Sequence, residues 1–225
     1  MFERLRKVLT GHGPAPPLAV GASTPLERWA RASGYVLERQ ERSQNFSMSG
    51  EFDGKAFRLD RMAASRHYIV GSELRARVVL GIAPEVSVMV ISRALRDALE
   101  HEAYADYTGR VRTTLDGNML EEVRWLATFD EVGWERGAVP AFWPRYAIVA
   151  DVRAHAQAWV GAELMQALLD WPSAAPEAPP FILHLQRGKL YLRMGFTPDD
   201  LPTLQRVTEV LALASAAALA GCAKP

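Results

Sequence analysis

Two stretches of the chain alternate apolar and polar residues on either side of a short turn. In FSMSGEFDGKAFRLDR, residues 46–61, the turn falls at Asp53-Gly54, because glycine tolerates the positive φ of a two-residue hairpin turn. Counting outward pairs Met48 with Leu59 on an apolar face and leaves serine, arginine and acidic residues on the other face. The segment therefore predicts an antiparallel hairpin with one buried face.

The second such stretch is FILHLQRGKLYLRM, residues 181–194, with its turn at Arg187-Gly188. Counting outward from this turn pairs Leu183 with Leu192 toward the core and His184 with Tyr191 on the opposite face. A hairpin is therefore predicted in each half of the chain.

Further strands are predicted from alternation and from continuous apolar runs. ELRARVVL, residues 73–80, directs leucine, alanine and valine inward and its glutamate and arginines outward. VSVMVIS, residues 86–92, is apolar on both faces, which is typical of a central strand. GRVRTTL (109–115) and YAIVAD (146–151) are also predicted as strands.

Helical spacing and capping residues predict helices between the strands. Thr24-Pro25-Leu26-Glu27 is a capping box with proline at the first helical position. Other helices are expected after Ser92, over LEEVRWLATF (120–129) and after Asp151.

The last helix is predicted to begin at Thr197 and to end at Gly221 in a left-handed C-cap, with Cys222 just beyond it. Its apolar positions follow helical spacing at Leu204, Val207, Leu211, Ala214 and Ala218.

The fold class that follows is α+β, with antiparallel sheet built on hairpins and packed helices. Residues 23–225 fit one continuous sheet or two similar lobes, 23–107 and 108–225. Residues 1–22 are predicted to be a short amphipathic helix followed by a Pro/Gly linker. Because that helix is basic, contact with anionic lipid makes a peripheral membrane protein one alternative function.

Composition and charge narrow the class of protein. Apolar residues make up 49% and charged residues 23% of the 225 residues, which is the range of globular proteins. A single cysteine excludes an internal disulfide and suits a reducing cytoplasm, where we expect the protein to reside. The net charge is zero, but it is +5 over residues 1–80 and −5 over residues 81–140. No basic run is interleaved with aromatic residues, so nucleic acid is not an expected partner.

Sequence motifs for cofactors and nucleophiles are missing. The chain has no Walker loop, no dinucleotide fingerprint and no GxSxG elbow, so no cofactor is predicted. Arg66 and His67 lie in a predicted loop and are candidates for binding a phosphate or a carboxylate.

Scattered acids and histidines allow a second alternative, a hydrolase-type enzyme. Asp97 and His101 are four residues apart, as are Asp151 and His155, so each pair can share a helix face. Helical ion pairs or caps explain both pairs, and no metal site is predicted. Catalysis would require several of these residues, together with His184, to meet in one pocket.

Tryptophan is concentrated in one region, because five of the six lie within residues 125–171. The segment FDEVGWERGAVPAFWPRYA, residues 129–147, mixes aromatic residues with glycine, proline and acids in what should be irregular backbone. Such aromatic residues either seal a loop onto the domain or bind a partner. Trp134, Glu135, Trp143 and Arg145 are the candidate binding surface.

Four stretches of the second half resemble uncharacterised proteins of proteobacteria. They are RWLATFDEVGW, FWPRYAIVADVRAHAQAWVG, LLDWP and RGKLYLRMGFTPDDLPTLQ. The resemblance spans most of residues 24–221 and implies a bacterial cytoplasmic setting, but it implies no activity and no site residue.

The function that the sequence favours is a non-enzymatic binding or interaction module that uses the aromatic loop. Its partner is expected to be a protein or a small molecule. A monomer and a homodimer both remain open.

Overall fold

The computed structural model describes residues 23–40, 43–109, 120–134, 139–171, 179–197 and 200–223. The predicted helix and linker over 1–22 lie outside these residues, as does most of the strand predicted over 109–115.

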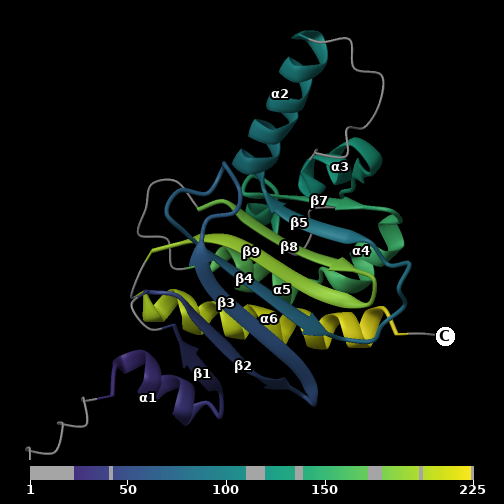
Figure 1. Cartoon of the computed structure of the whole chain (residues 1–225). Coiled ribbons are helices and arrows are strands. Elements are labelled where there is room, and N and C mark those ends of the chain that lie inside the picture. The colour runs from purple at the N-terminus through teal and green to yellow at the C-terminus, as the bar shows by residue number, and fades with distance from the viewer. Residues whose placement is uncertain are drawn as a thin grey trace, which may run out of the picture.

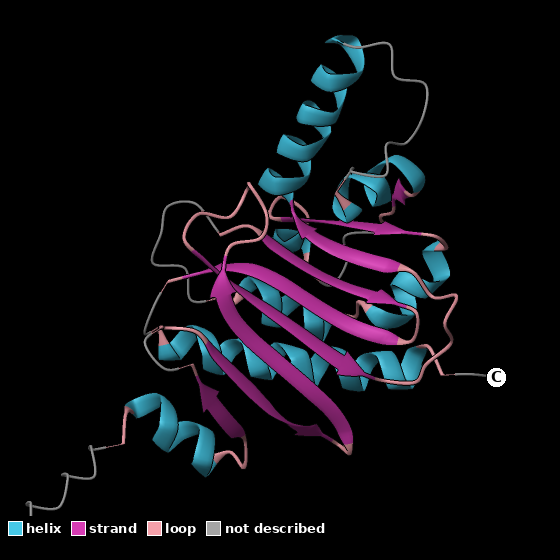
Figure 2. Ribbon diagram, viewed as in Figure 1, coloured by secondary structure: helices cyan, strands magenta, loops and turns pink. Residues whose placement is uncertain are grey.

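Within these described residues, nine strands form one antiparallel sheet in the order β1-β2-β3-β4-β9-β8-β5-β7-β6 (Figures 1 and 2). This architecture confirms the predicted α+β class. The strands are β1 (Val36–Arg39), β2 (Phe46–Phe52), β3 (Lys55–Ala63), β4 (Ser72–Val79), β5 (Val88–Ser92), β6 (Asp130–Glu131), β7 (Tyr146–Ala150), β8 (Phe181–Gln186) and β9 (Lys189–Phe196). Because β9 pairs with β4, strands from both halves of the chain share this sheet.

Both predicted hairpins form with the predicted register. Met48 pairs with Leu59 in the β2–β3 hairpin, and Leu183 pairs with Leu192 in the β8–β9 hairpin. Both residues of each turn have positive φ, between 48° and 73°, as a type I′ turn requires. The predicted central strand 86–92 is β5, which is buried over its whole length between β7 and β8.

One face of the sheet is covered by three helices, α4 (Arg153–Trp159), α5 (Ala162–Leu169) and α6 (Leu201–Gly221) (Figure 1). The predicted apolar stripe of α6, from Leu204 to Ala218, is buried in this core. Trp159 of α4 is fully buried and donates its indole N–H to the carbonyl oxygen of Ala214 at 3.0 Å. The main core therefore lies between the sheet and this helix layer.

Two other helices lie on the opposite face, over β5 and β7. They are α2 (Arg93–Gly109), which projects beyond the sheet in Figure 2, and α3 (Glu121–Thr128). Leu95, Leu99 and Trp125 pack there against Met89 and Val149 in a second, smaller core. The rest of this face, over β2, β3, β4 and β9, carries mainly polar side chains, and we call it the open face.

The first described helix, α1 (Pro25–Ala32), begins at the predicted capping box. The Glu27 carboxylate accepts from the Thr24 backbone N–H at 2.9 Å, and the Thr24 hydroxyl accepts from the Glu27 N–H at 3.2 Å. The capping box therefore sets the start of this helix.

The predicted ends of the last helix are wrong in two respects. Its N-cap is Asp200, whose carboxylate accepts from the Thr203 N–H at 3.0 Å, whereas Thr197 directly follows β9. Gly221 is the last helical residue and does not have positive φ. Glycine is required there because α4 passes so close that a Cβ would lie 2.2 Å from the Ala158 carbonyl oxygen.

Candidate functional site

The loop between β6 and β7 borders an open hollow of about 750 Å³, which we call the aromatic pocket. Its walls come from this loop, from the start of α2 and from the start of α4. The described residues that line it are Arg93, Glu131, Gly133, Trp134, Pro140, Trp143, Pro144 and Arg153. Small-molecule sites typically enclose about 300–1,000 Å³, so the pocket has a suitable size.

A buried aromatic side chain positions Trp143, one of the two tryptophans of this pocket. Phe142 ends the 3₁₀ helix η1 (Pro140–Phe142), is fully buried and stacks on Tyr146 with ring centroids 5.2 Å apart. The next residue, Trp143, remains half-buried and meets Trp134 edge to face, with centroids 5.1 Å apart and planes at 90°. Two aromatic rings in this favoured geometry therefore lie together at the pocket.

Guanidinium groups outnumber carboxylates around the pocket. Arg93 Nε donates to the Trp143 carbonyl oxygen at 2.9 Å, and Arg93 Nη2 donates to Glu131 at 2.8 Å. Arg96 also pairs with Glu131 at 2.8 Å, so one carboxylate lies between two cations. Arg153 adds an exposed cation to the wall, and the described residues give the pocket a net positive charge.

The structure brings together two of the four predicted binding residues. Trp134 and Trp143 line the same pocket, whereas Arg145 is exposed and donates to the Leu169 carbonyl oxygen at 3.0 Å. Glu135 lies outside the described residues. The sequence analysis missed Arg93 and Arg153, because only the packing of α2 and α4 around the loop brings these distant positions to it.

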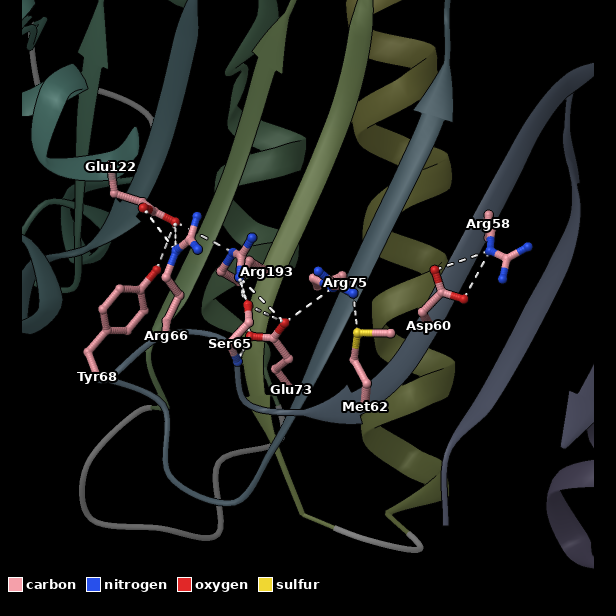
Figure 3. A network of polar contacts seen from close by, with 10 residues as sticks. All are labelled: Arg58, Asp60, Met62, Ser65, Arg66, Tyr68, Glu73, Arg75, Glu122 and Arg193. Atoms are coloured by element: carbon pink, nitrogen blue, oxygen red, sulfur yellow. Dashed lines mark hydrogen bonds and ion pairs between the residues drawn. The ribbon is translucent and has the colours of Figure 1, made fainter. Parts of the chain in front are cut away.

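Arg66, one of the two predicted anion ligands, lies at one end of the open face beside Glu122 of α3 (Figure 3). Arg66 Nε contacts both carboxylate oxygens of Glu122, at 3.0 and 3.2 Å, and Tyr68 donates its hydroxyl to Glu122 at 3.0 Å. His67 is exposed and meets Glu102 of α2 at 2.9 Å. Carboxylates of the chain itself therefore stand where a bound anion would lie, and anion binding by Arg66 and His67 stays a prediction.

A second buried carboxylate extends this network across the sheet. Glu73 is fully buried on β4 and accepts from the Ser65 backbone N–H at 3.1 Å. Arg75 and Arg193 each pair with Glu73 at 3.2 Å, and Arg193 also reaches Glu122 at 3.5 Å (Figure 3). The network therefore neutralises both acids and fastens the loop that joins β3 to β4 onto the sheet.

Electrostatics explain how Glu122 stays ionised although it is buried. Burial by itself would raise the pKa of Glu122. Its own backbone N–H and the Arg66 guanidinium outweigh burial and hold the pKa below the usual range. This carboxylate therefore serves as a charged anchor for Arg66 and Arg193 rather than as a proton donor at neutral pH.

His184 lies beside this network on β8. Its ring stacks on Tyr191 with centroids 5.0 Å apart and lies 5.6 Å from the Trp125 ring. Burial lowers the pKa of His184 to about 4, with a smaller lowering from Arg193 and an opposing effect from Glu122. The imidazole is therefore neutral at physiological pH.

The lowered pKa of His184 predicts a loss of stability in mild acid. Between pH 6.5 and pH 4 the unfolded chain binds this proton and the folded chain does not, so the free energy of unfolding falls by about 1–3 kcal/mol. Urea unfolding at several pH values across this range measures the slope of the free energy of unfolding against pH. His184→Gln should flatten it, whereas His101→Gln, at an exposed position of α2, should not. An unchanged slope in His184→Gln would assign the acid sensitivity to another group.

The structure does not assemble the residues of the hydrolase alternative. Asp97 and His101 are exposed on α2, and Asp151 pairs with His155 at 3.2 Å at the start of α4. His184 lies under α3, between Trp125 and Tyr191. Within the described ranges, no group of three or more His, Cys, Asp or Glu residues is placed to hold a metal ion.

No described helix is both long enough and apolar enough to cross a bilayer.

Comparison with known proteins concerns the fold alone. No protein-family model and no curated protein matches the chain. The crystal structure of the mycobacterial trehalose monomycolate transport factor A, TtfA, is similar with a TM-score of 0.50 and 9% identity. The similarity covers 88% of this chain and 94% of that one, so it extends over most of both chains and not over one motif alone.

Proposed function

We propose that this protein is a non-enzymatic binding module whose aromatic pocket holds a segment of a partner protein. The observation that carries the proposal is the Trp134–Trp143 pair, half-buried at an open hollow beside Arg93 and Arg153. Tryptophan and arginine are enriched among the residues that contribute most to protein–protein binding. A partner segment that presents an apolar or aromatic residue next to an acidic one suits these rings and this charge.

The composition of the pocket favours binding over catalysis. Glu131 is the only carboxylate among its described lining residues, and two guanidinium groups hold it. The described lining includes no histidine, cysteine, serine or lysine to act as nucleophile or base. The solved structure with a similar fold, TtfA, is that of a transport factor.

The proposal predicts that the two tryptophans matter more for binding than for folding. Peptides selected on the wild-type protein from a random display library should be rich in acidic and aromatic residues. The double variant Trp134→Ala/Trp143→Ala should bind them at least about a hundredfold more weakly, because each tryptophan supplies contact energy of about 2 kcal/mol or more. Isothermal titration calorimetry with a selected synthetic peptide measures the loss.

Trp29→Ala is the matched control, because Trp29 is a half-buried tryptophan of α1, far from the pocket in the sequence and not part of its lining. It should retain peptide binding and lower the Tm at least as much as the double variant. If the double variant unfolds at the temperature of the binding assay, the rings serve packing and the proposal is wrong. Arg153→Glu separately tests the positive charge of the pocket. This variant should weaken the binding of acidic peptides more than the binding of neutral ones.

A further inference from the structure

A charged side chain of β3 points to the core side of the sheet. The alternation of β3 places Arg61 on the same face as Phe57 and Leu59, and the side chain has only 5% exposure. The neighbouring positions on this face are apolar, so the Arg61 guanidinium is removed from water. The arginines of the open face, by contrast, remain in contact with water.

Among the described residues, the hydrogen-bond partners of this guanidinium are all neutral groups. Arg61 donates to the backbone oxygen and to the side-chain oxygen of Gln44, and to the Ser72 hydroxyl at 3.0 Å. Its Nε is buried and has no acceptor, and no carboxylate among the described residues forms an ion pair with it. By contrast, Arg66 and Arg193 are both neutralised by glutamate. Buried charges in proteins are normally paired, whereas Arg61 has no counter-ion among the described residues.

The same side chain lines a cavity of about 380 Å³ where α1, β2 and the first turn of α6 meet. Beside Arg61 the described lining is largely apolar, with Pro25, Leu26, Phe46, Phe196, Leu201 and Leu204, and a polar rim with Thr24, Arg39, Ser43, Gln44 and Asn45. Asp200 does not supply the missing charge, because it caps α6 through Thr203. The cavity thus joins an apolar compartment to a cation that no described carboxylate pairs with.

We propose that this cavity binds an anionic amphiphile, a molecule with one negatively charged head group and a short apolar tail. The head group pairs with the Arg61 guanidinium, and the tail packs among the leucine and phenylalanine side chains. The positive end of the α6 dipole, at Leu201, favours the same charge. This site is separate from the aromatic pocket, with which it shares no described lining residue.

Octanoate and 1-octanol test the proposal on the whole protein, since they share a chain length and differ in charge. Octanoate should raise the Tm in a concentration-dependent manner, and 1-octanol should raise it much less. Equal shifts would overturn anion recognition. Isothermal titration calorimetry gives the corresponding affinities.

Arg61→Met tests the residue, and Arg77→Met, an exposed arginine of the open face, is its matched control. Arg61→Met should bind octanoate at least about tenfold more weakly, whereas Arg77→Met should bind it as wild type does. Without ligand, Arg61→Met should melt at the wild-type temperature or above, because the variant no longer buries an unpaired charge. Undiminished octanoate binding by Arg61→Met would overturn the assignment.

A second variant keeps the test decisive if Arg61→Met does not fold. Leu26→Trp, from the half-buried side of α1, fills part of the apolar compartment and leaves the guanidinium in place. It should abolish the octanoate-induced rise in Tm. An unaltered rise would show that the ligand binds elsewhere and would overturn the proposal.

Discussion

Gly221→Ala is expected to lower the free energy of unfolding by about 3 kcal/mol or more, at the upper end of what overpacking costs. A Cβ at this position would lie 2.2 Å from the Ala158 carbonyl oxygen and 2.8 Å from the carbonyl carbon. Both atoms belong to the backbone of α4, so no side-chain rotation relieves the overlap. The helices must move apart, and the core between α4 and α6 then loosens around Trp159.

Thermal and urea unfolding measure this effect. For a chain of this size about 3 kcal/mol corresponds to a fall in Tm of roughly 6–12 °C. Gly195→Ala is the matched control, because a Cβ there meets only side-chain atoms at 3.7 Å or beyond, in an extended strand. It should remain within about 0.5 kcal/mol of wild type. If Gly221→Ala is equally mild, the close contact of the two helices does not constrain the fold.

Glu73→Leu is expected to destabilise the protein by about 3–5 kcal/mol, which is the cost of removing one partner from a buried ion pair. The substitution leaves the Ser65 backbone N–H without its acceptor and deprives Arg75 of its carboxylate. Arg193 keeps its hydrogen bond to the Ser65 hydroxyl at 2.9 Å, but its remaining ion pair is the longer contact with Glu122, at 3.5 Å. The loop between β3 and β4 should therefore detach from the sheet before the core unfolds.

Urea unfolding gives the change in stability, and amide hydrogen exchange over residues 64–71 reports on the loop. Glu51→Leu provides the control, because Glu51 is an exposed acid on the open face, and it should change stability by no more than about 0.5 kcal/mol. A stability for Glu73→Leu within about 1 kcal/mol of wild type would contradict the role assigned to the network.

The local elements of this fold follow from short stretches of sequence. Asp53-Gly54 and Arg187-Gly188 set both hairpin registers, because backbone conformation at the turn fixes every pair that follows. The capping box at Thr24 likewise needs only four neighbouring residues. The prediction for α6 located its apolar stripe, but it misplaced the start of the helix by a few residues, since several polar residues there can cap.

The candidate sites depended on contacts between distant residues. Trp134 and Trp143 could be singled out because they are concentrated in one loop, whereas Arg153 joined them only through the packing of α4. Glu73 alternates outward on β4 as expected, yet it is fully buried, because α3 and the 64–71 loop cover that end of the open face. The alternation of a strand predicts on which face of the sheet a side chain lies, but it does not predict which other elements cover that face.

Sequence by itself determined the two hairpins, the doubly buried β5 and the inward face of α6, since each depends on the period of apolar residues within one element. Only the tertiary structure decided that the β8–β9 hairpin inserts between β4 and β5. It also decided that Gly221 serves a close helix contact, and that Arg61 lines a cavity where no described carboxylate pairs with it. These features arise where elements distant in the chain meet, and the periodicity of one element carries no information about its neighbours.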